Sequence, residues 1–222
     1  DYGKGFADAF QAAYEAAGGS VTLSAPHEDG KADYSAEVGA LASAGGDALV
    51  VLGYVDQGGA GVIQGALDTG AFDMFAMGDG MIGDSLVERF GDDIAGMIGT
   101  APGSDNEGSA LFAEMATAAG IDGTSVYAGE SYDAAALMLL AMAVAGSKEP
   151  GDYQSHIFAV ANAPGEQILP GELDKALEII AAGGDVDYQG ATGVELVEPG
   201  EAAGSYAEFT VEDGALKVVG YR

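Results

Sequence analysis

Two tyrosines and one aspartate stand where predicted strands end. Tyr54 comes directly after the apolar run 48–52, and Asp79 follows the predicted strand 72–77, while Tyr2 would follow a strand that ends before residue 1. In a parallel sheet with helical crossovers, ligands bind at the carboxyl ends of the strands, where loops and helix N-termini meet. We therefore expect two phenols and a carboxylate at one rim, where together they indicate a binding site. The alternatives are loop tyrosines packed against helices and an aspartate that caps the next helix.

A glycine motif overlaps this set of residues. Gly78, Gly80 and Gly83 form a G-x-G-x-x-G pattern between a predicted strand and a predicted helix, which is the context of a dinucleotide-binding turn. The charge of Asp79 would oppose a pyrophosphate, and no cation follows until Arg89. The acidic residue expected about 20 positions later is replaced by an uncharged Thr-Ala-Pro segment. A nucleotide- or flavin-dependent enzyme is therefore a weak alternative, and we expect no cofactor.

The residues that enzymes and metal sites use are scarce. His27 and His156 are the two histidines and lie in different predicted parts of the chain, and cysteine is absent. Neither a metal pair nor a catalytic triad is indicated by that pattern. Ser104 and Ser131 lack the G-x-S-x-G context that exposes a nucleophile. The residues predict no enzyme, no catalytic group and no metal ligand.

The charge of the chain limits its partners. The 222 residues include 7 Lys and Arg against 36 Asp and Glu, a formal charge of −29 at pH 7, yet 48% of them are hydrophobic. This composition fits a folded protein with a core and not a disordered acidic tail. A surface so negative repels phosphate backbones and anionic lipid headgroups, so we expect no nucleic-acid and no membrane-surface partner. Adaptation to high salt is an alternative explanation of the same acidity.

The sequence gives few signs of targeting. The longest apolar run, 134–146, is shorter than the roughly 20 residues that span a bilayer. The chain opens at Asp1 without a basic or apolar signal segment, so we expect that a leader has been removed or that upstream sequence is missing. The lack of cysteine excludes a disulfide scaffold without identifying a compartment.

The first hundred residues alternate between strand and helix patterns. Predicted strands start near residues 20, 48, 72 and 97, and helically spaced apolar residues lie between them. This βα repeat predicts a parallel sheet with right-handed crossovers, and so an α/β fold. The predicted strands are 21–23, 48–52, 72–77 and 97–101. The first predicted helix, 5–17, precedes these strands, and the other predicted helices lie between them.

After residue 102 the pattern changes to helices. Ser104 and Glu107 match a capping box ahead of the next helix, and 131–145 is apolar on nearly all faces, so that helix should be buried. Few strands are found between 104 and 184, so these helices predict part of a second lobe whose sheet lies outside this chain. The residues 206–218 alternate about an Asp-Gly pair, which predicts a closing β-hairpin.

The order of segments resembles the type 1 periplasmic binding proteins, and most closely their leucine/isoleucine/valine-binding branch. The segments that carry the resemblance are DYGKGFADAFQAAYEAAGG, ADYSAEVGALASAGGDALVVLGY, FAMGDGM, SYDAAALMLLAMAVAGS, YQGATGVELVEPGEAAG and AEFTVEDGALKVV. The resemblance covers essentially the whole chain, which looks like the C-terminal two-thirds of such a protein.

The resemblance implies an organisation in two α/β lobes with three-layer parallel sheets. Residues 1–103 and 205–222 are similar to the second, C-terminal lobe. Residues 104–204 are similar to the latter, mostly helical part of the first lobe, whose upstream sheet would be missing. A fragment of this kind is expected to self-associate through the exposed apolar helix.

The resemblance also implies a function. Such proteins are exported to the periplasm or cell exterior, bind a solute between their lobes and deliver it to an ABC permease in the membrane. The family's second-lobe contacts fall on Tyr2, Tyr54 and Asp79, with Gly80 beside them, and the acidic residue at the Asp79 position, commonly Glu, takes the ligand's α-ammonium. The expected ligand is an aliphatic or branched-chain amino acid. The alternative ligands for the same fold are an amide, a urea or an aromatic acid. The alternative function is a sensory role.

Overall fold

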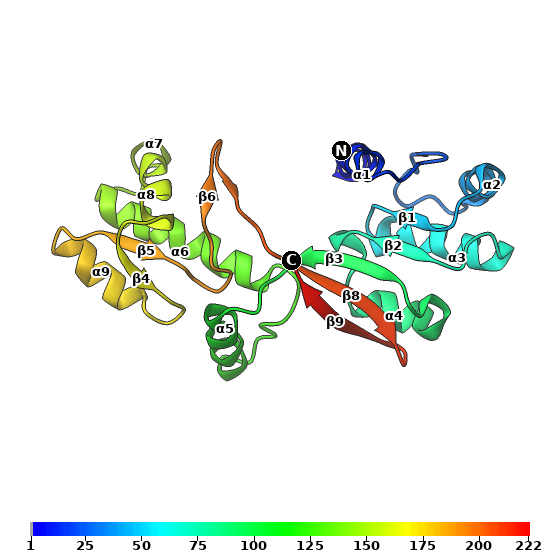
Figure 1. Ribbon diagram of the computed structural model, residues 1–222. Coiled ribbons are helices and arrows are strands. Elements are labelled where there is room, and N and C mark those ends of the chain that lie inside the picture. Colours follow the sequence, from blue (N-terminus) through cyan, green and yellow to red (C-terminus); the bar gives the residue numbers. More distant parts are fainter. Residues whose placement is uncertain (1) are drawn as a thin grey trace. The chain divides into compact units, whose positions relative to one another are not determined.

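The structure, a computed structural model, describes residues 2–222 as two compact units (Figure 1). Unit 1 comprises the residues up to Ala101 together with Glu208–Gly220, and unit 2 comprises Pro102–Ala207 with Tyr221–Arg222. The chain therefore passes from one unit to the other near Ala101, near Ala207 and near Gly220. Each unit has its own buried apolar residues, and each is described separately below.

Unit 1 is built on a five-stranded sheet with the strand order β1-β2-β3-β8-β9. Strand β1 (Leu49–Val51) pairs in parallel with β2 (Phe75–Met77), and β2 pairs in parallel with β3 (Ile98–Pro102). The βα repeat predicted from the sequence is confirmed for these three strands. The buried side chains of Phe75, Ile63 and Leu86 join the sheet to its flanking helices. The helices of unit 1 are α1 (Tyr2–Ala16), α2 (Ser35–Ala44), α3 (Gly59–Thr69) and α4 (Asp84–Phe90), with the 3-10 turns η1 (Val55–Gln57), η2 (Asp79–Met81) and η3 (Gly91–Ile94).

The predicted hairpin at the end of the chain is confirmed. Strands β8 (Tyr206–Glu212) and β9 (Ala215–Tyr221) are joined at Asp213 and Gly214, whose φ angles are 53° and 68°. Two consecutive positive φ values are what a tight two-residue hairpin turn requires, and Asp-Gly tolerates them.

The predicted strand 21–23 is absent. Val21–Leu23 has no ladder partner among the described residues and bends at Thr22, whose hydroxyl donates a hydrogen bond to the Gly45 carbonyl at 2.6 Å. Three residues of β-favouring type form a strand only where a neighbouring strand offers its backbone. Helix α1 beside this segment buries none of its residues, so its apolar side chains, which carried the sequence prediction, are not part of a packed core here.

Unit 2 contains more strand than the sequence predicted. Strands β4 (Glu166–Ile168) and β5 (Val186–Tyr188) form a parallel pair, and Ile168, Val186 and Tyr188 are buried in one apolar cluster with helix α6. The expectation that this helix has no sheet to cover is therefore wrong, since it covers the β4-β5 pair. These strands were not predicted because three residues are too few to show a period in the sequence. A second, antiparallel pair consists of β6 (Leu196–Val197) and β7 (Glu201–Ala202). The helices are α5 (Glu107–Ala118), α6 (Ala128–Ala145), α7 (Pro150–Tyr153), α8 (Ile157–Ala161) and α9 (Leu173–Ala181), with the 3-10 turn η4 (Gln154–His156).

Helix α6 is buried on one face and not on most faces as predicted. Leu140 and Ala141 are inaccessible, whereas Leu139 is 56% exposed and Val144 is also exposed. By length and composition this helix is apolar enough to cross a membrane. One face of the helix is packed within unit 2, where it holds the buried carboxylate of Asp133 and covers the β4-β5 pair.

The predicted capping box at the start of α5 is wrong. The N-cap is Asn106, whose side-chain oxygen accepts a hydrogen bond from the Ser109 amide at 2.8 Å, and Glu107 is the first helical residue. Asparagine caps a helix as well as serine does, so the choice between Ser104 and Asn106 depended on where the chain turns after β3. The Ser104 hydroxyl instead donates a 3.5 Å hydrogen bond to the Ala191 carbonyl.

Candidate functional site

Tyr2, Asp79 and Gly80 are linked by hydrogen bonds in unit 1. The Tyr2 hydroxyl donates to Oδ1 of Asp79 at 2.7 Å and accepts a bond of 3.3 Å from the Gly80 amide. Asp79 and Gly80 lie in the η2 turn just after β2, and Tyr2 opens α1. The strand-end argument from the sequence thus brought together residues 77 positions apart, and the alternative in which Asp79 caps α4 is wrong because the N-cap of α4 is Gly83.

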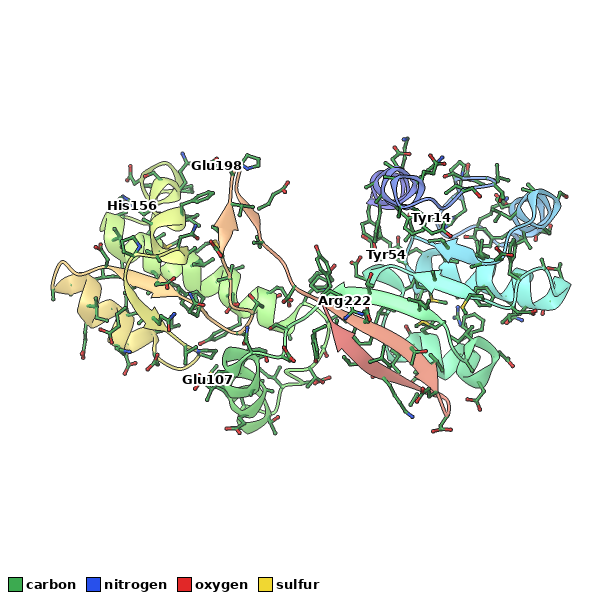
Figure 2. All side chains as sticks on the ribbon, viewed as in Figure 1. Tyr14, Tyr54, Glu107, His156, Glu198 and Arg222 are labelled. Atoms are coloured by element: carbon green, nitrogen blue, oxygen red, sulfur yellow. The ribbon has the colours of Figure 1, made fainter. Side chains whose placement is uncertain are left out.

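Tyr54 completes the cluster at the end of β1. Its ring stacks on the ring of Tyr2 with a centroid separation of 5.0 Å and an interplanar angle of 28°. Offset stacking of this kind is favourable for two aromatic rings. Tyr54, labelled in Figure 2, is 41% exposed, so part of its side chain is accessible to solvent. The four residues predicted from the sequence, Tyr2, Tyr54, Asp79 and Gly80, are therefore neighbours.

Glycine at position 80 is required by close approach. A Cβ atom built there would collide with the Gly53 carbonyl oxygen and lie 3.0 Å from the Tyr54 ring. The same lack of a side chain leaves the Gly80 amide accessible to Tyr2. The turn after β2 and the turn after β1 are thus in direct backbone contact, and this contact fixes Tyr54 relative to Asp79.

The electrostatics of the cluster keep Tyr2 neutral. Burial, followed by the hydrogen bond and the negative charge of Asp79, raises the pKa of Tyr2 to about 12. Each of these causes disfavours the phenolate. At neutral pH Tyr2 is therefore a proton donor toward Asp79, and the cluster presents one carboxylate charge held by a neutral phenol.

The glycine motif does not have the geometry of a phosphate-binding turn. The Gly80 amide, a donor that a pyrophosphate would need, is directed to the Tyr2 hydroxyl. The Asp79 carboxylate lies in the same turn, and Gly83 begins a separate helix of seven residues. The motif instead allows the close packing described above.

The two histidines lie in different units, as predicted: His27 in unit 1 and His156 in unit 2. Among residues 2–222, no three His, Asp or Glu side chains come together in a way that could hold a metal ion.

Two neighbours of the cluster were not predicted from the sequence. Phe6, one turn along α1, packs edge-on against Tyr2 with a centroid separation of 5.9 Å. The helical spacing of Phe6 from Tyr2 was a usable signal. His27 lies behind the Tyr54 turn, close to Gly53, and nothing in its spacing indicated this position.

A second, buried polar cluster lies in unit 2 around Asp133 of α6. Its carboxylate accepts hydrogen bonds from the Tyr188 hydroxyl at 2.9 Å, the Ala191 amide at 2.8 Å, and the Thr192 amide and hydroxyl at 2.8 and 2.7 Å. Burial, with the charge of Asp133, raises the pKa of Tyr188 well above its ordinary value. Through these hydrogen bonds Asp133 joins α6 to the turn after β5. Its side chain is only 2% exposed, so it offers no access to a ligand.

The family of the chain is shown by comparison with known protein families. The sequence profile described as periplasmic binding protein matches residues 1–156, about two-thirds of the chain. The chain belongs to the periplasmic binding protein family, of type 1, as the resemblance of its segments predicted.

Solved structures of similar proteins support the same fold. The leucine-binding protein LivK of Thermotoga maritima is 22% identical, with a TM-score of 0.74, over 100% of this chain and 57% of its own. The branched-chain amino acid binding protein LivJ of Streptococcus pneumoniae, solved with isoleucine, is 19% identical with a TM-score of 0.69, over 100% of this chain and 56% of its own. A type 1 periplasmic binding protein of Bordetella pertussis gives a TM-score of 0.74 at 19% identity, over 98% of this chain and 58% of its own. The α/β fold with a parallel-sheet core is confirmed, and the chain spans a little over half the length of these proteins.

One curated relative has a described role. The chemotactic signal transduction substrate-binding protein BasB of Halobacterium salinarum is 33% identical over 92 residues, which are 41% of this chain and 22% of BasB.

Proposed function

We propose that this chain is part of an extracytoplasmic solute-binding protein that takes an amino acid at the Tyr2–Asp79 cluster and serves an ABC importer. The observation that carries the proposal is the 2.7 Å hydrogen bond that holds the Asp79 carboxylate beside the exposed ring of Tyr54, at the carboxyl end of the sheet of unit 1. The family of the chain and its likeness to leucine- and isoleucine-binding proteins support this choice of ligand class.

The chemistry of the cluster suits the ammonium end of a zwitterion. Two opposite charges about 4 Å apart interact by roughly 4 kcal/mol at an effective dielectric constant near 20. This energy selects a charged amine over a neutral amide. Tyr2 holds the carboxylate in one orientation, and the ring of Tyr54 offers an apolar face to the ligand's carbon atoms. Aspartate is one methylene shorter than the glutamate common in the family, so the ligand lies closer to the sheet or a water molecule bridges the gap.

The same resemblance supports the assignment of the two units to lobes. Residues 1–103 and 205–222 would form the C-terminal lobe, and 104–204 the latter part of the N-terminal lobe. An exported, periplasmic or extracellular location and a membrane permease partner follow from this assignment as part of the proposal. A chemosensory role is the second candidate, and the similarity to the chemotactic signal transduction protein BasB favours it.

A thermal-shift screen tests the proposal. The protein is heated with aliphatic amino acids, with their amides and with their deaminated analogues. A ligand at about 100 times its Kd adds roughly 2.7 kcal/mol to the free energy of unfolding, which gives a visible rise in Tm. A rise confined to amino acids supports the proposal. A rise with amides or organic acids alone contradicts the role of the Asp79 charge, and a flat screen contradicts amino acid binding by this chain.

A further inference from the structure

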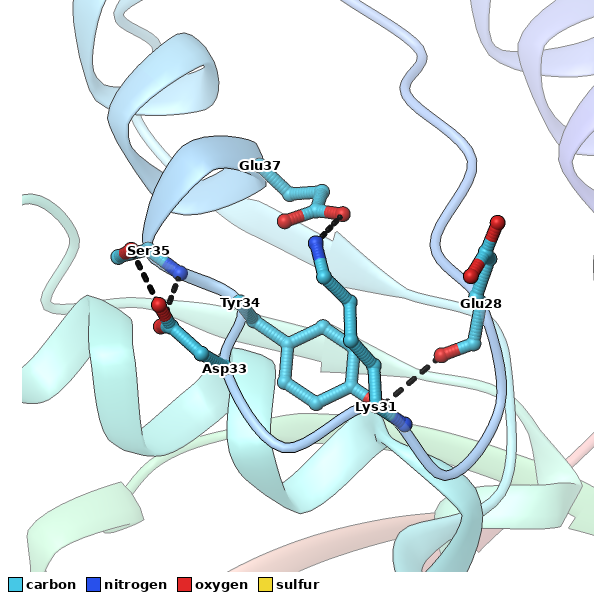
Figure 3. Close-up of polar contacts among 6 residues, drawn as sticks. All are labelled: Glu28, Lys31, Asp33, Tyr34, Ser35 and Glu37. Atoms are coloured by element: carbon cyan, nitrogen blue, oxygen red, sulfur yellow. Dashed lines mark hydrogen bonds and ion pairs between the residues drawn. The ribbon is translucent and has the colours of Figure 1, made fainter.

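The loop before α2 packs behind the turn that carries Tyr54. The Gly30 amide donates a 3.0 Å hydrogen bond to the Gln57 carbonyl at the end of that turn. Within the loop, the Tyr34 hydroxyl donates to the Glu28 carbonyl at 2.9 Å and accepts from the Lys31 amide at 3.1 Å (Figure 3). These bonds close the loop around the ring of Tyr34, which is buried.

His27 fills the space between this loop and the Tyr54 turn. A Cβ atom built on Gly53 would lie 3.2 Å from Cε1 and 3.3 Å from Nε2 of His27, and one built on Gly58 would lie 3.0 Å from Cδ2. Gly53 and Gly58 bracket the turn of residues 54–57. The imidazole therefore lies against both ends of that turn, and the ring of Tyr34 meets it edge-on at 5.8 Å.

The contact is one of shape. Nε2 of His27 is inaccessible to solvent and has no hydrogen-bond partner. A buried polar atom without a partner costs about 1–3 kcal/mol. Hydrogen bonding by Nε2 therefore does not explain the position of the imidazole. The fit of its flat ring against two glycines explains that position.

The turn supported by His27 also determines the geometry of the ligand cluster. The Gly53 carbonyl oxygen packs on Gly80, and the ring of Tyr54 packs on both Gly80 and Tyr2. A shift of Gly53 would therefore move the ring of Tyr54. It would at the same time loosen the backbone contact between Gly53 and Gly80, which lies beside Asp79.

We propose that His27 is a positioning residue for the ligand cluster, which acts by holding the Tyr54 turn against Gly80. The consequence for ligand affinity rests on the proposed function, whereas the effect on the Tyr2–Tyr54 stack does not. His27 reaches the cluster only through the backbone of the turn. Its loss therefore changes the arrangement of Tyr54 more than it changes the stability of unit 1.

The test compares His27→Ala with His27→Phe, which keeps a flat ring and removes the unpartnered nitrogen. Nuclear Overhauser contacts between the rings of Tyr2 and Tyr54 are measured without ligand. We expect them to be lost in His27→Ala, retained in His27→Phe, and restored in His27→Ala by added imidazole. His156→Ala, in unit 2, is the matched control and should leave the contacts unchanged. Ring contacts that persist in His27→Ala would overturn the proposal.

Affinity is measured on the same variants with L-leucine and L-isoleucine as probes. We expect Kd to rise about tenfold or more in His27→Ala and to recover with imidazole, because small misplacements of binding groups weaken a site strongly. If wild-type protein binds neither probe, the proposed ligand class fails while the ring contacts still decide the role of His27. If His27→Ala does not fold, loss of the contacts in folded His27→Phe would contradict a role carried by the shape of the ring.

Discussion

The hydroxyl of Tyr2 donates a 2.7 Å hydrogen bond to Oδ1 of Asp79, which joins the first turn of α1 to the end of β2. The phenol is the proton donor, and burial together with the carboxylate raises its pKa to about 12, which extends its neutral form further into alkali. The bond orients a carboxylate without neutralising its charge. This distinguishes the arrangement from an ion pair, in which a protein cation would compete with a cationic ligand.

The raised pKa of Tyr2 predicts a distinct ionisation in alkali. The ultraviolet absorbance of tyrosinate is followed in wild type and in Tyr2→Phe, and the difference between the two curves isolates Tyr2. We expect its midpoint near pH 12 and not near 10, with a shift downward in Asp79→Asn. Because the folded-state pKa lies above the ordinary value, the stability contributed by Tyr2 is complete below about pH 10 and is lost as the pH rises through about 12. A midpoint near 10 would show that Tyr2 is not held by Asp79.

The charge of Asp79 predicts selective loss of ligand affinity. Asp79→Ala and the isosteric Asp79→Asn should each weaken the amino acid that gives the largest thermal shift by about 2 to 5 kcal/mol, as expected when one partner of a buried charge pair is removed. Calorimetric titration measures the change. Asp47→Asn, at an exposed position of the same unit, is the control and should bind as wild type does. Unchanged affinity in both Asp79 variants would remove this residue from the site.

Close packing at Gly80 predicts that an added methyl group separates the two turns. Gly80→Ala would drive a Cβ into the Gly53 carbonyl and against the Tyr54 ring, and should cost about 1–3 kcal/mol of stability. Gly83→Ala is the matched control, because its backbone is extended and a Cβ there meets nothing within 4 Å. Because Gly83 is the N-cap of α4, where alanine is less favourable than glycine, we expect this control to lose no more than about 1 kcal/mol by urea denaturation. Equal stabilities of the two variants would contradict the contact.

The sequence predicted the location of the cluster well because the argument needed only topology. A buried apolar run followed by Tyr54, and a second followed by Asp79, place both residues at the carboxyl ends of parallel strands without knowledge of any side-chain angle. Tyr2 was placed by the same rule and by the family resemblance. The role of these residues in ligand binding stays a prediction.

The elements that the sequence misplaced depend on partners distant along the chain. Residues 21–23 have strand-forming side chains but no strand beside them, and β4 and β5 are too short to show a period. Asn106 and Ser104 are both good caps, and the path of the chain after β3 selects between them. The position of His27 against Gly53 was not predicted, because a single histidine in a polar loop has no sequence signal that reveals such a contact.

The buried carboxylate in unit 2 predicts a large loss of stability. Asp133→Ala leaves the donors of Tyr188, Ala191 and Thr192 without their acceptor inside the protein, and we expect a cost of about 3 kcal/mol or more. Asp133→Asn should recover only part of this, because one side-chain oxygen is replaced by a donor that faces the Thr192 amide or the Ala191 amide. Urea denaturation measures both variants, with the exposed Asp47→Ala as control. A cost below about 1 kcal/mol would show that these hydrogen bonds are replaced by water.

The excess of carboxylates predicts stabilisation by salt. With a formal charge of −29 and ion pairs that involve Lys4, Lys31, Lys175 and Lys217, most of the 36 acidic side chains repel one another across the surface. Raising potassium chloride from about 0.05 M to 1 M shortens the Debye length to about 3 Å and removes most of this repulsion. We expect Tm to rise steadily over that range, whereas sucrose at equal osmolality, which does not screen charge, should follow a different curve. A Tm independent of salt would mean that the acidic residues are spaced widely enough to avoid mutual repulsion, and it would contradict salt adaptation as the reason for this composition.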